Sequence, residues 1–217
     1  MLNQNFDKVF LILAIIIGAI TFKSNSPTYI KLFPLFLLIR LSIEISAKYF
    51  IKRGQNNIPY YNFLSILEIV FYLYVFREII SIKYIRKVIS ILLFTIPIII
   101  IMNILFFQGI YIFHTYTFTI SAIILLILSS LYFYYTFKKT EIILLHKEPS
   151  FWLTTGIAFF FTSTISIMGI SNYISILPKL IIAQMHSALL IVNCLFYILI
   201  SIAFLCQINI QKSTHNS

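Results

Sequence analysis

Three charged side chains inside two long apolar runs constrain this chain more than any other feature. Leu32–Phe50 and Pro59–Phe76 are each long and apolar enough to cross a bilayer, yet they contain Arg40, Glu44 and Glu68. A bare charge at the centre of a membrane helix costs at least about 2.5–3.5 kcal/mol. The fold must therefore pair these side chains with one another or enclose them inside a bundle.

The composition places the chain in a membrane. Of its 217 residues, 60% are hydrophobic and only 10% are charged, and the mean hydropathy is +0.99, which exceeds what a soluble core of this size needs. The alternating pattern of a membrane barrel is absent, so helices are expected. We predict an all-α polytopic helix bundle forming a single transmembrane domain over residues 1–217, because no polar stretch is long enough for a separate soluble domain.

Seven apolar runs of roughly spanning length follow one another along the chain. Turn-forming residues separate them, for example at Gly54, Gln108 and Ser171. The expected transmembrane helices are Val9–Phe22, Leu32–Phe50, Pro59–Phe76, Val88–Phe107, His114–Phe137, Phe151–Ile170 and Ala183–Cys206.

The basic residues predict an orientation. One side of the membrane carries the loops after the first, third and fifth runs, and it holds twice as many Lys and Arg residues as the other side. In membrane proteins the loops rich in Lys and Arg lie in the cytoplasm. We therefore expect the N-terminus outside and the C-terminus in the cytoplasm. The same distribution explains the net charge of +10 by contact with the lipid bilayer, and no nucleic-acid partner is expected.

The three buried charges are expected to form one polar centre. Arg40 and Glu44 are one helical turn apart on the same face, and Glu68 falls at a similar depth, roughly 12 Å below the outer end of its helix. With all three ionised the group carries a charge of −1, so one glutamate is expected to take a proton or hold a cation. We interpret these residues, with Asn193 of the last helix, as a ligand or ion centre; a purely structural ion pair is the alternative.

Other polar residues lie in the outer half of the predicted helices. They are expected to line a cavity that opens to the outside, although amides and hydroxyls between membrane helices also serve as packing contacts. The residues in question are Asn62, Asn103, His114 and His186.

The segment between the fifth and sixth runs is a candidate cytoplasmic interface. It mixes Lys138 and Lys139 with a short apolar stretch, and Trp152 follows at the membrane boundary. Such a segment suits a docked partner or the membrane surface itself.

Catalytic motifs are missing from the sequence. The four histidines are scattered, without a His-x-x-x-His or His-Glu-x-x-His pair, and neither a Gly-x-Ser-x-Gly elbow nor a phosphate-binding loop occurs. A seven-helix zinc hydrolase needs clustered histidines, but the last run has only His186, and a retinal protein needs a lysine there, which is absent. No enzyme activity, no metal and no cofactor are expected; a membrane-embedded hydrolase remains a remote alternative.

The stretch Glu-Pro-Ser-Phe-Trp-Leu-Thr-Thr-Gly, which ends at Gly156, resembles the start of the sixth helix in a family of uncharacterised bacterial seven-helix inner-membrane proteins. That family has Asn-Pro-x-Phe-Trp here, so Glu148 replaces its Asn. The resemblance implies a multi-pass protein of the bacterial inner membrane, with acidic positions that correspond to Glu44 and Glu68. Genes of the family often stand beside those of sensor histidine kinases, which implies a membrane sensor kinase or another signalling partner.

Two functions follow as expectations. The first is a non-enzymatic sensory or signalling component, in which a polar centre that faces outward acts through the basic inner loops. The second is a small solute transporter with three helices, a linker helix and three helices, which is similar to SWEET-type sugar carriers in size and orientation. The Pro-Gln pair expected of such carriers is absent.

Overall fold

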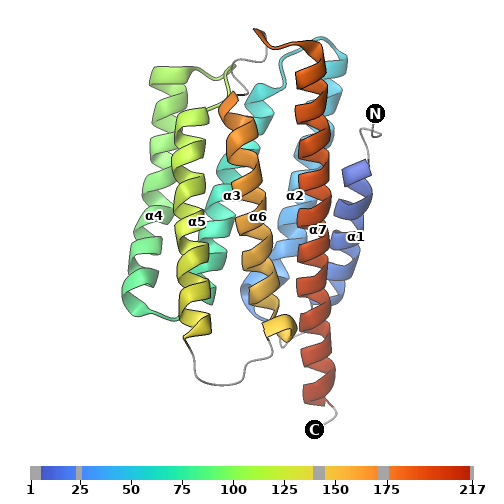
Figure 1. Cartoon of the computed structure of the whole chain (residues 1–217), viewed down its shortest axis with the longest axis vertical. Helices are drawn as coiled ribbons and strands as arrows, with labels where there is room; N and C mark the ends of the chain where they lie inside the picture. Colours follow the sequence, from blue (N-terminus) through green and yellow to red (C-terminus); the bar gives the residue numbers. More distant parts are fainter. Residues whose placement is uncertain (1–5, 23–25, 139–144, 171–175, 216–217) are drawn as a thin grey trace.

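The computed structural model describes residues 6–22, 26–138, 145–170 and 176–215, and within these ranges the chain is all-α (Figure 1). The prediction of seven helices without strands is confirmed for this part of the chain. The helices are α1 (Phe6–Ile20), α2 (Thr28–Lys52), α3 (Ile58–Ile79), α4 (Lys83–Asn103), α5 (Thr115–Phe137), α6 (Pro149–Ile170) and α7 (Lys179–His215).

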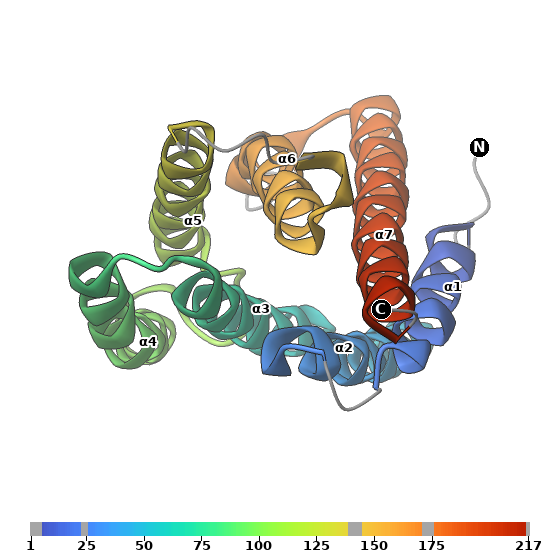
Figure 2. The ribbon, with the colours of Figure 1, turned by 90° about the horizontal axis from the view of Figure 1, so that it is seen from below.

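Six of the helices form a ring. Along it, α1 contacts α2, α2 contacts α3, α3 contacts α5, α5 contacts α6, α6 contacts α7, and α7 returns to α1. Helix α4 packs outside this ring against α3 and α5, as the view along the bundle in Figure 2 shows. The centre of the ring is therefore walled by α1, α2, α3, α5, α6 and α7, and α4 takes no part in it.

Five helices are long and apolar enough to cross a membrane: α3, α4 with the turn that follows it, α5, α6 and α7. Helix α2 has 25 residues but carries charges along its length, and α1 has only 15 residues. Both belong to the same bundle, because α2 packs between α1 and α3 and α1 packs against α7. The chain is thus a membrane protein by the composition of its helices.

Helix α1 packs very closely against two neighbours. Its buried face contains Asp7, Leu11, Ala14 and Gly18, which recur at the three- and four-residue spacing of a single helical stripe. At Gly18 a Cβ atom would lie 2.6 Å from Cγ of Pro34 and 2.7 Å from a ring carbon of Phe204. Only a residue without a side chain permits this approach of α1 to α2 and α7.

Aromatic rings fill part of the ring's interior. Tyr72 is fully buried and makes edge-to-face contacts with Phe161 and Phe196, at centroid distances of 5.7 and 6.2 Å. Phe36 stacks on Phe71 at 4.2 Å. Such pairs add about 0.5–1.5 kcal/mol each beyond the area they bury, so this layer ties α2, α3, α6 and α7 together beneath the polar centre.

The connection from α4 to α5 begins with an unusual turn. Ile104–Gln108 is a π-helix, and Gly109 ends it with a φ of 85° while its N–H donates to the carbonyl of Ile104. A single π-helical turn at the end of an α-helix often marks a place where side chains are redirected. Here it turns the side chain of Gln108 back toward the start of α5.

A candidate functional site around Arg40

The predicted contact among Arg40, Glu44 and Glu68 is confirmed. Nε of Arg40 donates to Oε1 of Glu44 at 3.0 Å, and Nη1 donates to Oε1 of Glu68 across the boundary between α2 and α3. The side chains of Arg40 and Glu68 are 5% and 6% exposed, and that of Glu44 is 12% exposed. The low exposure means that water contributes little to these ion pairs, so each charge depends on its protein partners.

Asn193 joins the group from α7, as the sequence predicted. Nη2 of Arg40 donates to its side-chain oxygen at 3.3 Å. The amide nitrogen of Asn193 in turn donates to Oδ2 of Asp7 at 3.5 Å, on α1. One chain of polar contacts therefore links α1, α7, α2 and α3.

Aromatic rings complete the surroundings of the guanidinium. Its central carbon lies 5.5 Å from the ring centroids of Phe160 and of Tyr197, within the range of cation–π attraction. The hydroxyl groups of Tyr72 and Tyr197 are buried and have no hydrogen-bond partner among the described residues. Arg40 is thus held by two carboxylates, one amide and two aromatic rings.

A cavity of about 620 Å³ reaches this polar group, a volume in the usual range of small-molecule sites. Its lining residues come from α1, α2, α3, α5, α6 and α7 and from the loop before α5. The charged ones are Asp7, Lys8, Arg40, Glu44, Lys48 and Glu68; the apolar ones include Leu64, Phe118, Phe160, Met168 and Leu190.

Asp7 is the site residue that sequence reasoning missed. It sits at the start of the first apolar run and resembles a flanking charge, yet it is only 6% exposed and lies in the first turn of α1. Its contact Asn193 lies fourteen residues into α7, roughly 21 Å from the start of that helix. Helix α1 therefore begins deep in the bundle, and the helical stripe that Asp7 shares with Leu11 and Ala14 was the available signal.

The predicted outer cavity residues divide into two groups. His186 lines the cavity, whereas Asn62, Asn103 and His114 are buried and are not among its lining residues. The prediction that these three line the cavity is wrong, because their polar groups are used within a network of their own. This network holds the N-terminal end of α3 against the start of α5.

Asn62 and His114 are the centre of that network. The Asn62 amide donates to the carbonyls of Ile110 and Ile112 at 3.1 and 3.0 Å and accepts from the backbone N–H of His114 at 3.2 Å. The His114 ring bonds to the hydroxyl of Ser65 through Nε2 and to Thr117 through Nδ1. These contacts fix the loop before α5 against α3.

We expect Asn62→Ala to loosen this loop. The substitution leaves two carbonyls and one N–H without partners, and each buried polar group left unsatisfied costs about 1–3 kcal/mol. Hydrogen–deuterium exchange over residues 110–114 should become much faster. Asn56→Ala is the matched control, because Asn56 bonds the carbonyl of Tyr111 on the exposed side of the same loop, where water replaces it. Equal exchange in both variants would contradict the assignment.

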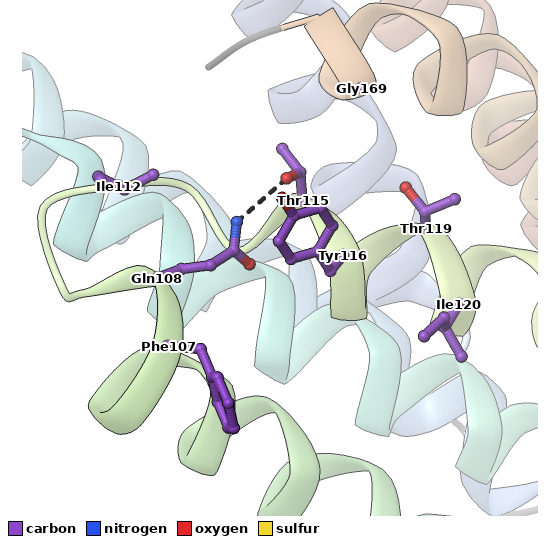
Figure 3. Close-up of a pocket in the computed structure, with 8 residues that line it drawn as sticks. All are labelled: Phe107, Gln108, Ile112, Thr115, Tyr116, Thr119, Ile120 and Gly169. Carbon is purple, nitrogen blue, oxygen red and sulfur yellow. Dashed lines mark hydrogen bonds between the residues drawn. The ribbon is translucent and has the colours of Figure 1, made fainter.

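A second hollow, of about 650 Å³, lies where the π-helical turn after α4 approaches the start of α5, and Gln108 lines it (Figure 3). Asn103 is buried beside this hollow and is not one of its lining residues. Its amide donates to Oε1 of Gln108 at 2.6 Å, and Nε2 of Gln108 donates to the hydroxyl of Thr115 at 3.2 Å. Phe107 and Tyr116, which also line it, are 82% and 68% exposed. The hollow thus opens sideways, on the apolar surface of the bundle, and the amide of Gln108 that lines it is occupied by Asn103 and Thr115.

The predicted cytoplasmic interface is described in part. Lys138 follows the last residue of α5 and is exposed, with its Nζ 5.7 Å from the centroid of the Tyr134 ring. The indole N–H of Trp152 donates to the carbonyl of His146 at 2.9 Å, which fixes the short turn before α6. Lys139 lies outside the described residues.

Comparisons with known proteins add no relative. No family model, curated protein or solved structure matches the chain. Within the described ranges, no group of three or more His, Cys, Asp or Glu residues is placed to hold a metal ion, and Cys194 and Cys206 are free thiols. The chemistry of the site therefore depends on its ion group and its cavity.

Proposed function

We propose that the protein is a non-enzymatic sensory component of the bacterial inner membrane, which binds a small ligand in the cavity and acts on a signalling partner such as a membrane sensor kinase. The N-terminus lies outside and the C-terminus in the cytoplasm, so the cavity faces the periplasm. The observation that carries the proposal is a cavity of about 620 Å³ that ends on a buried ion group. Ionisable side chains buried within membrane helices are costly and typically functional.

Helix α7 supports a signalling role. It has 37 residues, roughly 55 Å at the rise of an α-helix, and runs along the whole length of the bundle (Figure 1). Asn193 and Leu190 place its outer part on the cavity wall. A ligand that displaces either residue moves α7, whose other end carries the C-terminal segment. A ligand that contacts α7 more favourably in one conformation than in another shifts the equilibrium toward that conformation.

The test fills the cavity without altering its charges. Leu64 lines the cavity and is 5% exposed, whereas its neighbour Phe63 is 55% exposed on the outer surface of α3. In host cells, Leu64→Trp should alter the transcript levels of a discrete set of genes in the manner of a gene deletion, and Phe63→Trp should leave them as in the wild type. If Leu64→Trp is folded in membranes and its transcripts match the wild type, the cavity has no sensory role.

A solute transporter is the second candidate, and one arrangement favours it. Helices α1–α3 form one arc in which consecutive helices are neighbours, and α5–α7 form another. The two arcs meet where α3 contacts α5 and where α7 contacts α1, and α4 packs outside both. Two halves around a central cavity suit alternating access. Proteoliposomes incubated with labelled amino acids, sugars and amines distinguish the two roles: uptake abolished by Glu68→Gln identifies a transporter, and no uptake of any solute identifies a sensor.

A further inference from the structure

We infer that the ligand of this cavity carries a protonated amino group, and that Asp7 is the carboxylate that binds it. The inference deepens the proposed function and rests on it, because it names the chemical class of the ligand. It derives from one buried polar atom that has no hydrogen-bond partner among the described residues, and from the chemistry of the cavity wall around that atom.

The unpartnered atom is Oδ1 of Asp7. The side chain lines the cavity and the residue is 6% exposed, and among the described residues no donor reaches Oδ1. Its other oxygen accepts a long hydrogen bond of 3.5 Å from the amide of Asn193. A buried acceptor left unsatisfied costs about 1–3 kcal/mol, and more when it is charged, so a ligand that donates to Oδ1 recovers this loss.

The charges of the cavity favour a cationic donor at this point. Arg40 is already bonded to both Glu44 and Glu68, and Asp7, a third carboxylate, reaches this group through Asn193. Lys8 adjoins Asp7 in sequence, but neighbouring residues on a helix do not face each other. Lys48 lies two turns of α2 beyond Arg40, roughly 12 Å toward the outer end, and its charge interacts with those of Lys8 and Asp7. Three carboxylates therefore share one guanidinium and one amide at the deep end of the cavity, and among the described residues Oδ1 of Asp7 is left for a donor from a ligand.

The uncharged part of the wall favours an organic cation over a metal ion. Phe113, Phe118 and Phe160 line the cavity together with Tyr61 and Met168. Aromatic faces attract ammonium groups and also cover apolar carbon, whereas a metal ion needs several oxygen ligands at short distance. A volume of about 620 Å³ accommodates an amine with an aromatic or branched apolar body.

Three probes of matched shape test the inference on the full chain in lipid nanodiscs. They are phenethylamine, which is cationic, phenethyl alcohol, which is neutral, and phenylacetate, which is anionic. Calorimetric titration should show saturable binding of phenethylamine, at least about tenfold tighter than binding of the other two. In Asp7→Asn this preference should disappear, whereas Glu78→Gln, which alters an exposed carboxylate paired with Arg77, should retain it.

The comparison among probes on the unaltered protein keeps the inference testable even if Asp7→Asn does not fold. Tighter binding of phenylacetate or phenethyl alcohol overturns the amine assignment but leaves a cavity that binds ligands, so the proposed function survives. Retained amine preference in a folded Asp7→Asn overturns the role of Asp7. If none of the three probes binds, the amine assignment is overturned, and the transcript test of Leu64→Trp decides the proposed function separately.

Discussion

Replacing Arg40 by Leu should destabilise the protein by about 3–5 kcal/mol, the usual effect of removing one partner from a buried ion group. The substitution leaves Glu68, whose side chain is 6% exposed, and Glu44, at 12%, without a counter-charge. It also removes the donor to Asn193 that ties α7 to α2. The measurement is the temperature at which the detergent-solubilised protein aggregates, followed by size-exclusion chromatography after heating.

Two further variants identify the cause. Arg40→Leu combined with Glu68→Gln should recover part of the loss, because one stranded charge is neutralised. Arg77→Leu is the control, since Arg77 pairs with Glu78 at an exposed site, where both side chains are more than a third accessible and such pairs contribute at most about 1 kcal/mol. An Arg40→Leu protein as heat-resistant as the wild type would refute the ion group as a structural element.

Gly18→Ala should separate α1 from its neighbours. The added methyl group would lie 2.6 Å from Pro34 and 2.7 Å from Phe204, and both atoms belong to stiff rings in a packed interior. Overpacking of this kind typically costs about 1–3 kcal/mol. Because α1 carries Asp7, the shift should also weaken binding in the cavity, so thermal stability and ligand titration are both measured.

Gly169→Ala is the matched control. Gly169 lies in α6, and a Cβ atom there would have nothing within 4 Å. Alanine in place of glycine within a helix is favourable by up to about 1 kcal/mol, so this variant should be as stable as the wild type or slightly more stable. Equal destabilisation by the two substitutions would mean that packing at Gly18 is not the cause.

The sequence was sufficient for the fold class because hydropathy alone marks membrane helices. It was less informative about where the helices end. The last apolar run was Ala183–Cys206, whereas α7 extends over Lys179–His215. Hydropathy marks the apolar part of a helix, and the backbone hydrogen bonds of the helix continue beyond that part. In the same way α2 begins at Thr28 and ends at Lys52, outside the predicted run.

The polar centre was predictable for a different reason. A helical spacing brings Arg40 to Glu44, and equal depth brings Glu68 to both. Asp7 was not predicted because its depth depends on how far α1 is shifted along α7. The stripe that it shares with Leu11 and Ala14 indicates which way Asp7 faces and does not indicate that depth. Asn62 and His114 were assigned to the cavity because of their position along the predicted helices. That position does not distinguish a polar side chain that lines a cavity from one that hydrogen-bonds to its neighbours.

The order in which the ion group is completed has a consequence for biogenesis. As the chain leaves the ribosome, Arg40 meets Glu44 within the same helix, then Glu68 in the following helix, and only much later Asn193. Each arrival lowers the cost of keeping a charge in lipid. Helices α2 and α3 therefore suit insertion as a hairpin. Helix α7 emerges last, packs against both α1 and α6, and completes the ring after the other helices have been translated.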